Sequence, residues 1–313
     1  MTQPAPTGIG LDIGGTFLKG ARVDAAGRIV ARIREPIAKS SGEALLTQLT
    51  RAVASLEDGV PAAARAVGIG LPGIVERASH VRVAPAVPVL NGLPVGEDIA
   101  RRTGRAAFLE NDANAAALAE AWLGGGRGEA CLLCVTLGTG IGGGLVLDGR
   151  VWAGHSGYAG EIGHIQVEPD GVPCPCGSRG CLETIAGAGG WKRRAEALLA
   201  SRASSIRGRE LDPKAISEAA RAGDAVAIEV VDGVTRALGI GIAAALDLLN
   251  LKRVVIGGGV ADAGELLLGR IVAETRKRTF PQVFADCSFR LAELGGDAGV
   301  IGAARVAMLG LGA

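Results

Sequence analysis

One short segment, from Glu161 to Glu183, constrains this chain more than any other. It reads EIGHIQVEPDGVPCPCGSRGCLE and contains four residues of the kinds that ligate metals: His164, Cys174, Cys176 and Cys181. One imidazole and three thiols complete a tetrahedral Cys3His site, the stoichiometry of structural zinc, whereas a catalytic zinc keeps one position open. The pattern therefore predicts a structural Zn²⁺ site.

The composition of the same segment explains why it would need a metal. Its prolines and glycines prevent regular helix or strand, so the loop has little else to hold it. Zinc would supply the missing folding free energy. A disulfide or buried apolar cysteines are the alternative, disfavoured because no signal peptide points to an oxidising compartment. Glu161 and Glu183 flank the ligands and are candidates for binding a polar substrate.

The balance of charged residues indicates which classes of binding partner to expect. The 313 residues include 33 Lys or Arg and 32 Asp or Glu, so the net charge is +1. Such a balance offers no electrostatic surface for nucleic acid or a membrane. No uninterrupted apolar run approaches the roughly 18 residues of a spanning helix, and the N-terminus lacks the regions of a signal peptide. We therefore expect a cytoplasmic protein, long enough for two domains, that acts on a small molecule.

Glycine-rich turns recur at two places in the same context. Residues 8–24 read as an apolar strand, a glycine turn and a second strand, and a third strand is expected near 29–33. Residues 131–150 repeat the order of strand, glycine turn with Thr, and strand. We therefore predict a duplicated module. Formal G-x-G-x-x-G matches at 68–73 and 138–143 do not indicate a dinucleotide site, because no helix is expected directly after either one.

The first glycine turn has the groups that a phosphate site needs. Gly14, Gly15 and Thr16 can offer backbone N–H groups and a hydroxyl to phosphate oxygens. Asp12, just before the turn, can hold the hydration shell of a Mg²⁺ ion. Taken alone, the turn is more simply explained as an ordinary hairpin.

A predicted helix start at residues 110–114, reading ENDAN, offers a candidate base. An extended segment precedes it, an alanine-rich helix follows, and Asn111 and Asp112 stand where N-caps belong. Capping is the simpler interpretation for either residue alone. A carboxylate held between a strand and a helix is also suited to accept a proton from a substrate hydroxyl.

Periodicity and breakers predict the remaining elements. The expected helices are 42–57, 95–103, 191–199, 214–222, 224–249, 264–279 and 297–309, and the expected further strands are 66–73, 252–262 and 288–292. The strand at 252–262 runs into three glycines, and such a turn suits the base or ribose of a nucleotide.

Six motifs taken in order resemble the ROK family of sugar kinases and repressors. They are DIGGT at 12–16, ENDAN at 110–114, LGTGIGGG at 137–144, EIGH at 161–164, CPCGSRGCLE at 174–183 and VIGGGV at 255–260. The resemblance spans nearly the whole chain and implies an α/β, two-domain fold of the actin, Hsp70 and hexokinase type, which is ribonuclease H-like and has duplicated βββαβα units. The expected domains are 1–112, joined by a C-terminal helix at 297–313, and 113–296, which contains the zinc loop 161–183.

The resemblance also implies an ATP-dependent hexose kinase, with glucose 6-phosphate as the expected product. Asp112 looks like the general base that accepts the proton of the sugar hydroxyl attacking the γ-phosphate. Asn111, Glu161, His164 and Glu183 look like ligands of sugar hydroxyls, so His164 would both bind zinc and face the sugar. The residues that match the family's nucleotide and Mg²⁺ motifs are Asp12, Gly14, Gly15, Thr16, Gly138, Thr139, Gly140, Gly257 and Gly258.

One departure from the family pattern bears on the substrate. Family glucokinases often carry an N-L-x-x-W-like stretch where this chain has Ala86 and Leu90, with Asn91 displaced. N-acetylmannosamine, N-acetylglucosamine, fructose or allose are therefore alternative substrates. A non-catalytic sugar sensor is the alternative from another class, but a sensor needs neither Asp112 nor a phosphate turn.

The resemblance further bears on partners. The first hairpin begins near residue 8, which leaves no room for the winged helix-turn-helix that many repressors of the family carry, so no nucleic acid partner is expected. Relatives are commonly dimers or tetramers, so we expect a homo-oligomer.

Overall fold

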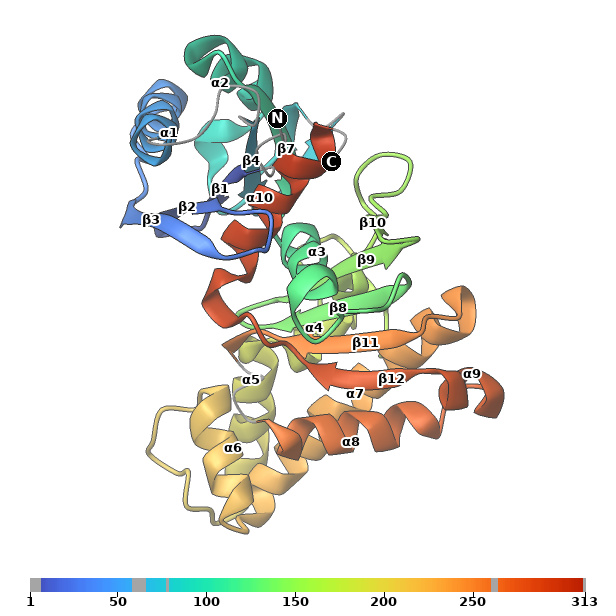
Figure 1. The fold of residues 1–313 in the computed structure, drawn as a ribbon. Helices are drawn as coiled ribbons and strands as arrows, with labels where there is room; N and C mark the ends of the chain where they lie inside the picture. The colour runs from blue at the N-terminus through green and yellow to red at the C-terminus, as the bar shows by residue number, and fades with distance from the viewer. Residues whose placement is uncertain (1–6, 58–65, 77–78, 260–263, 312–313) are drawn as a thin grey trace. The chain divides into compact units, whose positions relative to one another are not determined.

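The computed structural model describes residues 7–57, 66–76, 79–259 and 264–311, and these form two compact units (Figure 1). Unit 1 comprises Met1–Gly128, Gly144–Ala159 and Leu294–Ala313, and unit 2 comprises Glu129–Gly143 and Gly160–Glu293. The chain therefore passes from one unit to the other four times. The domain boundary expected at residue 112 stays a prediction.

Unit 1 contains a five-stranded sheet in the order β3-β2-β1-β4-β7. Its strands are β1 (Gly8–Ile13), β2 (Phe17–Val23), β3 (Ile29–Pro36), β4 (Ala66–Leu71) and β7 (Ala106–Asn111). The first three strands are antiparallel neighbours, and β4 lies parallel to both β1 and β7. Every residue of β4 is buried, as expected for a central parallel strand, whereas edge strand β3 alternates between half-buried and exposed.

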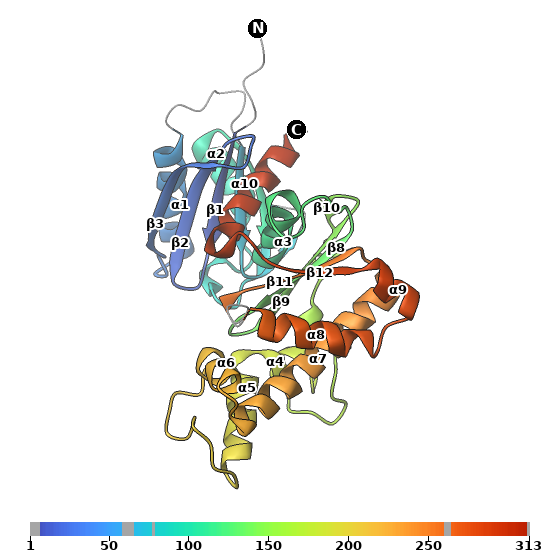
Figure 2. The same cartoon turned by 60° about the horizontal axis from the view of Figure 1, so that its bottom comes forward.

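Helices pack on both faces of this sheet. They are α1 (Gly42–Leu56), α2 (Val95–Thr103), α3 (Asp112–Leu123) and α10 (Ala298–Gly310). Figure 2 shows these four helices beside the strands of the sheet. Buried residues of α1 and α2 share one hydrophobic cluster with the strands, and those of α3 and α10 share a second cluster. Glycine permits the close approach of α10, since a Cβ at Gly10 would lie 2.0 Å from the carbonyl oxygen of Val300.

The second sheet repeats this arrangement in the order β10-β9-β8-β11-β12. Its strands are β8 (Leu132–Leu137), β9 (Ile141–Leu147), β10 (Arg150–Val151), β11 (Arg253–Gly257) and β12 (Ser288–Leu291). As in the first sheet, the first strand in sequence is central and pairs in parallel with the fourth, which pairs in parallel with the fifth. The predicted duplication and the expected fold class are confirmed.

The described residues of unit 2 add six α-helices to its part of this sheet. They are α4 (Leu182–Ala186), α5 (Ala188–Leu199), α6 (Pro213–Arg221), α7 (Ala225–Leu249), α8 (Glu265–Arg276) and α9 (Pro281–Asp286). α7 has 25 residues and is buried along much of its length, as its apolar sequence predicted. Within the described ranges, no helix combines the length and apolar character needed to cross a membrane.

Most predicted elements are confirmed within two or three residues. The hairpin of β5 (Ile74–Glu76) and β6 (His80–Val83) was not predicted, nor were the short elements β10, α4 and α9. Of the expected strand at 252–262, β11 covers residues up to Gly257, while 260–262, including the last residue of VIGGGV, lie outside the described residues. Residues 1–6 and 312–313 of the expected domains lie outside them too.

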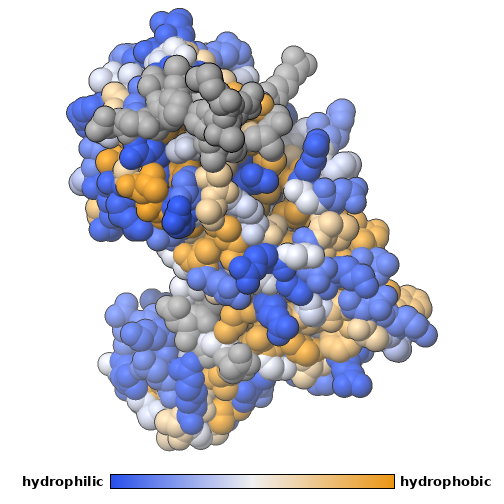
Figure 3. Space-filling view, in the orientation of Figure 1, coloured by the Kyte–Doolittle hydropathy of each residue, from blue (hydrophilic) through white to orange (hydrophobic). Residues whose placement is uncertain are grey.

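Hydrophilic residues cover much of the face shown in Figure 3, with apolar areas between them.

Candidate functional site

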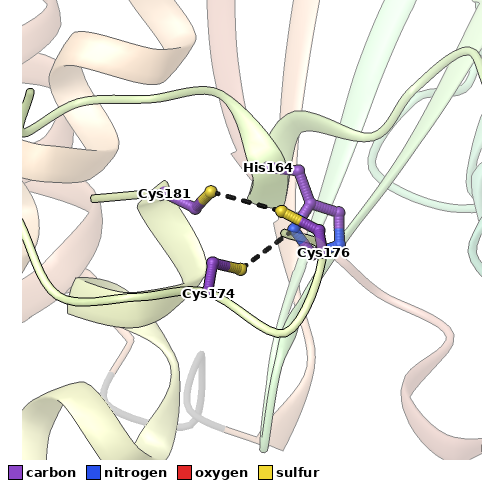
Figure 4. A group of neighbouring side chains, drawn as sticks. All are labelled: His164, Cys174, Cys176 and Cys181. Carbon is purple, nitrogen blue, oxygen red and sulfur yellow. Dashed lines mark hydrogen bonds between the residues drawn. The ribbon is translucent and has the colours of Figure 1, made fainter. Parts of the chain in front are cut away.

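The four side chains predicted to bind zinc lie together in unit 2 (Figure 4). Their ligand atoms are all within 4.8 Å of one another. Cys174 Sγ lies 3.6 Å from His164 Nδ1, and Cys176 Sγ lies 3.6 Å from Cys181 Sγ. Bonds of about 2.3 Å to sulfur and about 2.0 Å to nitrogen place neighbouring ligands of a tetrahedral zinc about 3.5 to 3.8 Å apart. The donor set therefore fits a tetrahedral metal ion.

The loop that carries the three cysteines is held by backbone hydrogen bonds of turns and isolated bridges, without a continuous strand. Between η3 (Ile162–His164), a short 3-10 helix, and α4, the chain makes only isolated bridges, as at Gln166 and Cys181. Gly177 and Gly180 have φ angles of +94° and +61°, which L side chains rarely adopt. The prediction that this segment forms neither a helix nor a regular strand is confirmed.

Burial and hydrogen bonding shift the pKa values of two of the thiols in opposite directions. Burial raises the pKa of Cys181 to about 12, whereas the backbone N–H of Ser178 lowers the pKa of Cys176. A bound cation would remove the proton from both groups, because metals bind the thiolate.

The two ring nitrogens of His164 face different neighbours. Nδ1 lies beside Cys174, and Nε2 lies 3.8 Å from Glu161 Oε2. Burial raises the pKa of Glu161, and the nearby Glu183 raises it further, while His164 opposes both. Three of the four predicted sugar ligands are therefore close neighbours in unit 2, beside the Cys3His cluster. One ring can serve both, with one nitrogen on each side.

The second glycine hairpin lies against this group. Glu183, in the first turn of α4, accepts the N–H of Ile141 through Oε2 at 2.9 Å. A Cβ at Gly140 would lie 2.3 Å from the same oxygen. The N–H of Gly138 closes the turn by donating to the carbonyl of Gly140 at 3.0 Å. The N–H groups of Thr139 and Gly140 have no recorded hydrogen bond to a described residue, so these two can face an anion.

The end of β11 lies beside the strand that leads into this hairpin. Gly257 pairs in register with Thr136 of β8. Gly258 has φ +88°, and a Cβ there would lie 2.2 Å from the carbonyl oxygen of Leu137. The predicted adenosine motif and the second phosphate hairpin are thus adjacent in unit 2.

The first glycine turn and its carboxylate belong to unit 1. Gly14 donates its N–H to Phe17 O at 2.9 Å, which leaves the N–H groups of Gly15 and Thr16 without a recorded partner among the described residues. Burial raises the pKa of Asp12, and Lys19 Nζ, 3.7 Å from Oδ2, opposes this shift. A carboxylate of raised pKa would be stabilised in its charged form by a nearby cation.

Asn111 caps α3, as the simpler interpretation of the sequence predicted. Its Oδ1 accepts the N–H groups of Ala113 and Asn114 at 2.9 and 3.1 Å, and its Nδ2 donates to Gly73 O at 3.1 Å. The second amide hydrogen has no hydrogen bond to a residue that the structure describes, so it can serve a substrate. Asp112 opens the helix, and its Oδ1 also accepts the N–H of Ala113 at 2.9 Å.

A comparison with known protein families shows which family this chain belongs to. The model of the ROK family matches residues 8–309. The chain belongs to the ROK family. A glucokinase from Thermotoga maritima is 36% identical over 95% of this chain and 96% of its own length.

Solved structures of ROK proteins agree with this assignment. A ROK hexokinase from Thermus thermophilus has a TM-score of 0.86 and 36% identity, and the match covers 98% of this chain and 99% of that one. A ROK glucokinase from Streptomyces griseus, in complex with glucose and AMPPNP, has a TM-score of 0.78 and 35% identity over 97% and 99%. The sugar-kinase fold expected from the motifs is confirmed.

Two residues of this ROK protein that bear on the site were not assigned such a role from the sequence. Glu110, at the end of β7, accepts the N–H of Asn111 and the Nδ2 of Asn114, each at 3.0 Å. Lys19 pairs with Asp12 and donates to Gly296 O at 3.0 Å. The charge of Glu110, the first residue of ENDAN, was the only sequence signal for its role.

Proposed function

We propose that this chain is an ATP-dependent hexose kinase that transfers the γ-phosphate of ATP to a hydroxyl of glucose. One observation carries the proposal: Glu183 lies with Glu161 and His164 and also accepts a backbone N–H of the second glycine hairpin. The carboxylate of Glu183, which can bind sugar hydroxyls, is therefore hydrogen-bonded to the second glycine hairpin, which can bind phosphate. The glucokinase from Thermotoga maritima and the structure that contains glucose and AMPPNP, an ATP analogue, support it.

Asp112 is the proposed general base. Phosphoryl transfer requires little covalent chemistry from the protein, because the transition state is stabilised mainly by positioning and by neutralisation of charge. The start of α3 fixes the Asp112 carboxylate, and its Oδ1 already accepts the N–H of Ala113. The carboxylate would accept the proton of the sugar hydroxyl as this hydroxyl attacks the γ-phosphate.

The proposed sugar ligands combine acceptors with donors. Glu161 and Glu183 would accept hydrogen bonds from sugar hydroxyls, and the remaining N–H of Asn111 would donate one. His164 would contribute Nε2, because Nδ1 is directed at the cysteines. The protein thereby offers both partners that a hydroxyl needs.

The two glycine hairpins and the end of β11 would bind ATP. The first glycine turn would offer the N–H groups of Gly15 and Thr16 to phosphate oxygens. The second glycine hairpin would offer those of Thr139 and Gly140. These N–H groups are not used in closing the turns. Gly257 and Gly258 would lie against the adenosine, where the lack of side chains leaves room. Asp12 would hold the waters of Mg²⁺, which neutralises charge on the phosphates.

The metal of the Cys3His cluster is proposed to be structural Zn²⁺. Four protein ligands leave no open position for substrate, so the ion would supply folding free energy rather than chemistry. His164, Cys174, Cys176 and Cys181 would hold it.

Turnover of ATP across a panel of hexoses tests the proposal. The kcat/KM for glucose should exceed the values for mannose, fructose, allose, glucosamine, N-acetylglucosamine and N-acetylmannosamine. A preference for another hexose would retain the kinase mechanism and replace glucose as the substrate. Sugar binding without turnover on any hexose would contradict the kinase and favour a sensor. The expected dimer or tetramer stays a prediction, which light scattering of the same sample would check.

A further inference from the structure

We propose that Glu183 is a positioning residue for the nucleotide in addition to a ligand of the sugar. Its carboxylate fixes the hairpin of residues 138–141, and it thereby links the Cys3His loop to the binding of ATP. The inference rests on the proposed function, in which this hairpin binds phosphate. It assigns to the metal loop an effect on the nucleotide that is separate from any effect on the sugar.

The contacts around the hairpin are the first support. Glu183 Oε2 accepts the N–H of Ile141 at 2.9 Å, and the absence of a side chain at Gly140 leaves the space that this oxygen occupies. The N–H of Ala188 donates to Gly138 O at 3.2 Å. A Cβ at Gly187 would lie 2.9 Å from Thr139 O. The hairpin therefore rests on the α4–α5 segment at each of its residues, and Glu183 is the only side chain among these contacts.

The second support is the short path from the cluster to Glu183. Cys181 is the N-cap residue of α4, and Glu183 lies two residues further, in the first turn. The carbonyl of Cys181 accepts both the N–H and the Oγ1–H of Thr184, at 2.9 and 2.7 Å. These bonds tie the cysteine to the helix turn that carries Glu183. A metal that fixes Cys181 would therefore also fix the carboxylate.

The charge of Glu183 makes a direct contact with phosphate unfavourable, because like charges repel. A hydrogen bond to Ile141 uses the carboxylate in another way. It holds one end of the turn, so that the N–H groups of Thr139 and Gly140 are oriented before the nucleotide arrives. Orientation before binding reduces the entropy lost on binding.

Calorimetric titration of the full-length, zinc-loaded protein with AMPPNP and Mg²⁺, without sugar, separates this role from sugar binding. Glu183→Ala removes the acceptor, so the Kd for AMPPNP should rise about 10- to 100-fold, as expected for the loss of a hydrogen bond to a charged group. Glu183→Gln retains an acceptor oxygen, so its Kd should stay within about threefold of the wild-type value.

Glu161→Ala is the matched control, because Glu161 belongs to the same carboxylate group and has no recorded bond to the hairpin. It should weaken glucose binding and leave the Kd for AMPPNP unchanged. Gly140→Ala provides a second route should Glu183→Ala fail to fold. Its Cβ would displace the carboxylate from the side of the hairpin, and it should also raise the Kd for AMPPNP.

Two negative results have different meanings. Equal Kd values for AMPPNP in wild type, Glu183→Ala and Gly140→Ala would overturn the positioning role and leave the kinase proposal intact. No binding of AMPPNP to the wild type would overturn the proposed function and this inference together. Removal of the metal by a chelator should raise the Kd for AMPPNP in the wild type, and an unchanged Kd would break the link to the Cys3His loop.

Discussion

Glu120 accepts the backbone N–H of Leu294 at 2.9 Å, across a separation of 174 residues in the sequence. The second carboxylate oxygen accepts the N–H of Gly125, also at 2.9 Å. Only 1% of Glu120 is exposed, and a carboxylate is rarely so enclosed unless hydrogen bonds compensate for the lost water. Leu294 is the first residue of the last segment of unit 1. Glu120 therefore fixes the point at which the chain returns to this unit.

Glu120→Ala should lower the free energy of unfolding by about 2 to 4 kcal/mol, because it removes a buried charged acceptor of two backbone N–H groups. Urea denaturation followed by circular dichroism measures this loss. Glu97→Ala is the control, because 66% of the Glu97 side chain is exposed. This variant should change the free energy of unfolding by no more than about 0.5 kcal/mol. A similar change in both variants would show that the buried carboxylate has no special role.

The Cys3His cluster predicts about one zinc ion per chain, measured by elemental analysis. Treatment with a chelator should lower the melting temperature, because the loop at 165–181 contains neither a helix nor a continuous strand, and the metal would join its two ends. Cys176→Ser should lose the metal, whereas Cys287→Ser, a thiol outside the cluster, should retain it. Far less than one zinc per chain, with a melting temperature that a chelator does not change, would refute the structural metal.

The cluster could be predicted from the sequence because its ligands are close together in the chain. His164 and Cys181 are connected by one short loop, and proline and glycine exclude most regular structures between them. Helix α2 is a similar case, since the predicted and observed ends agree and Gly104 ends the helix with φ +67°. In both cases the information is local.

Other parts of the site depend on contacts between distant residues. The bond from Ile141 to Glu183 spans 42 residues, and the bond from Lys19 to Gly296 spans 277. No local pattern indicates these partners, because packing of the finished sheets and helices brings them together. The five-residue helix α4 was missed for the same reason: it is too short to show a period and is held by its contacts.

Asp112→Asn should reduce kcat at least about 100-fold if Asp112 is the general base. The amide oxygen of Asn can still accept the N–H of Ala113, so the helix start should persist and the Kd for glucose should stay within about threefold of wild type. Asp98→Asn, at an ion pair with Arg101 in α2, is the control and should retain full turnover. Wild-type kcat in Asp112→Asn, with the fold intact, would remove Asp112 from the mechanism.

Glu110 should make the stability of unit 1 depend on pH in a specific direction. Burial raises its pKa above the ordinary value of 4.5, so the folded chain binds more protons than the unfolded chain between 4.5 and the raised value. Stability therefore falls as the pH rises through this window. Glu110→Gln retains an acceptor for Asn111 and Asn114 and carries no charge to desolvate. Its melting temperature relative to wild type should be higher at pH 8 than at pH 4.

Glu43 should make stability depend on pH in the opposite direction, and melting temperatures at the same two pH values test this. Its hydrogen bond from Arg102 lowers its pKa, so the charged form is favoured in the folded state. The stabilisation is present above the ordinary value of 4.5 and is lost as the pH falls through the lowered value. Glu43→Gln should therefore melt below wild type at pH 8, with a smaller difference at low pH. The same pH trend in both variants would show that burial does not govern the charge of Glu110.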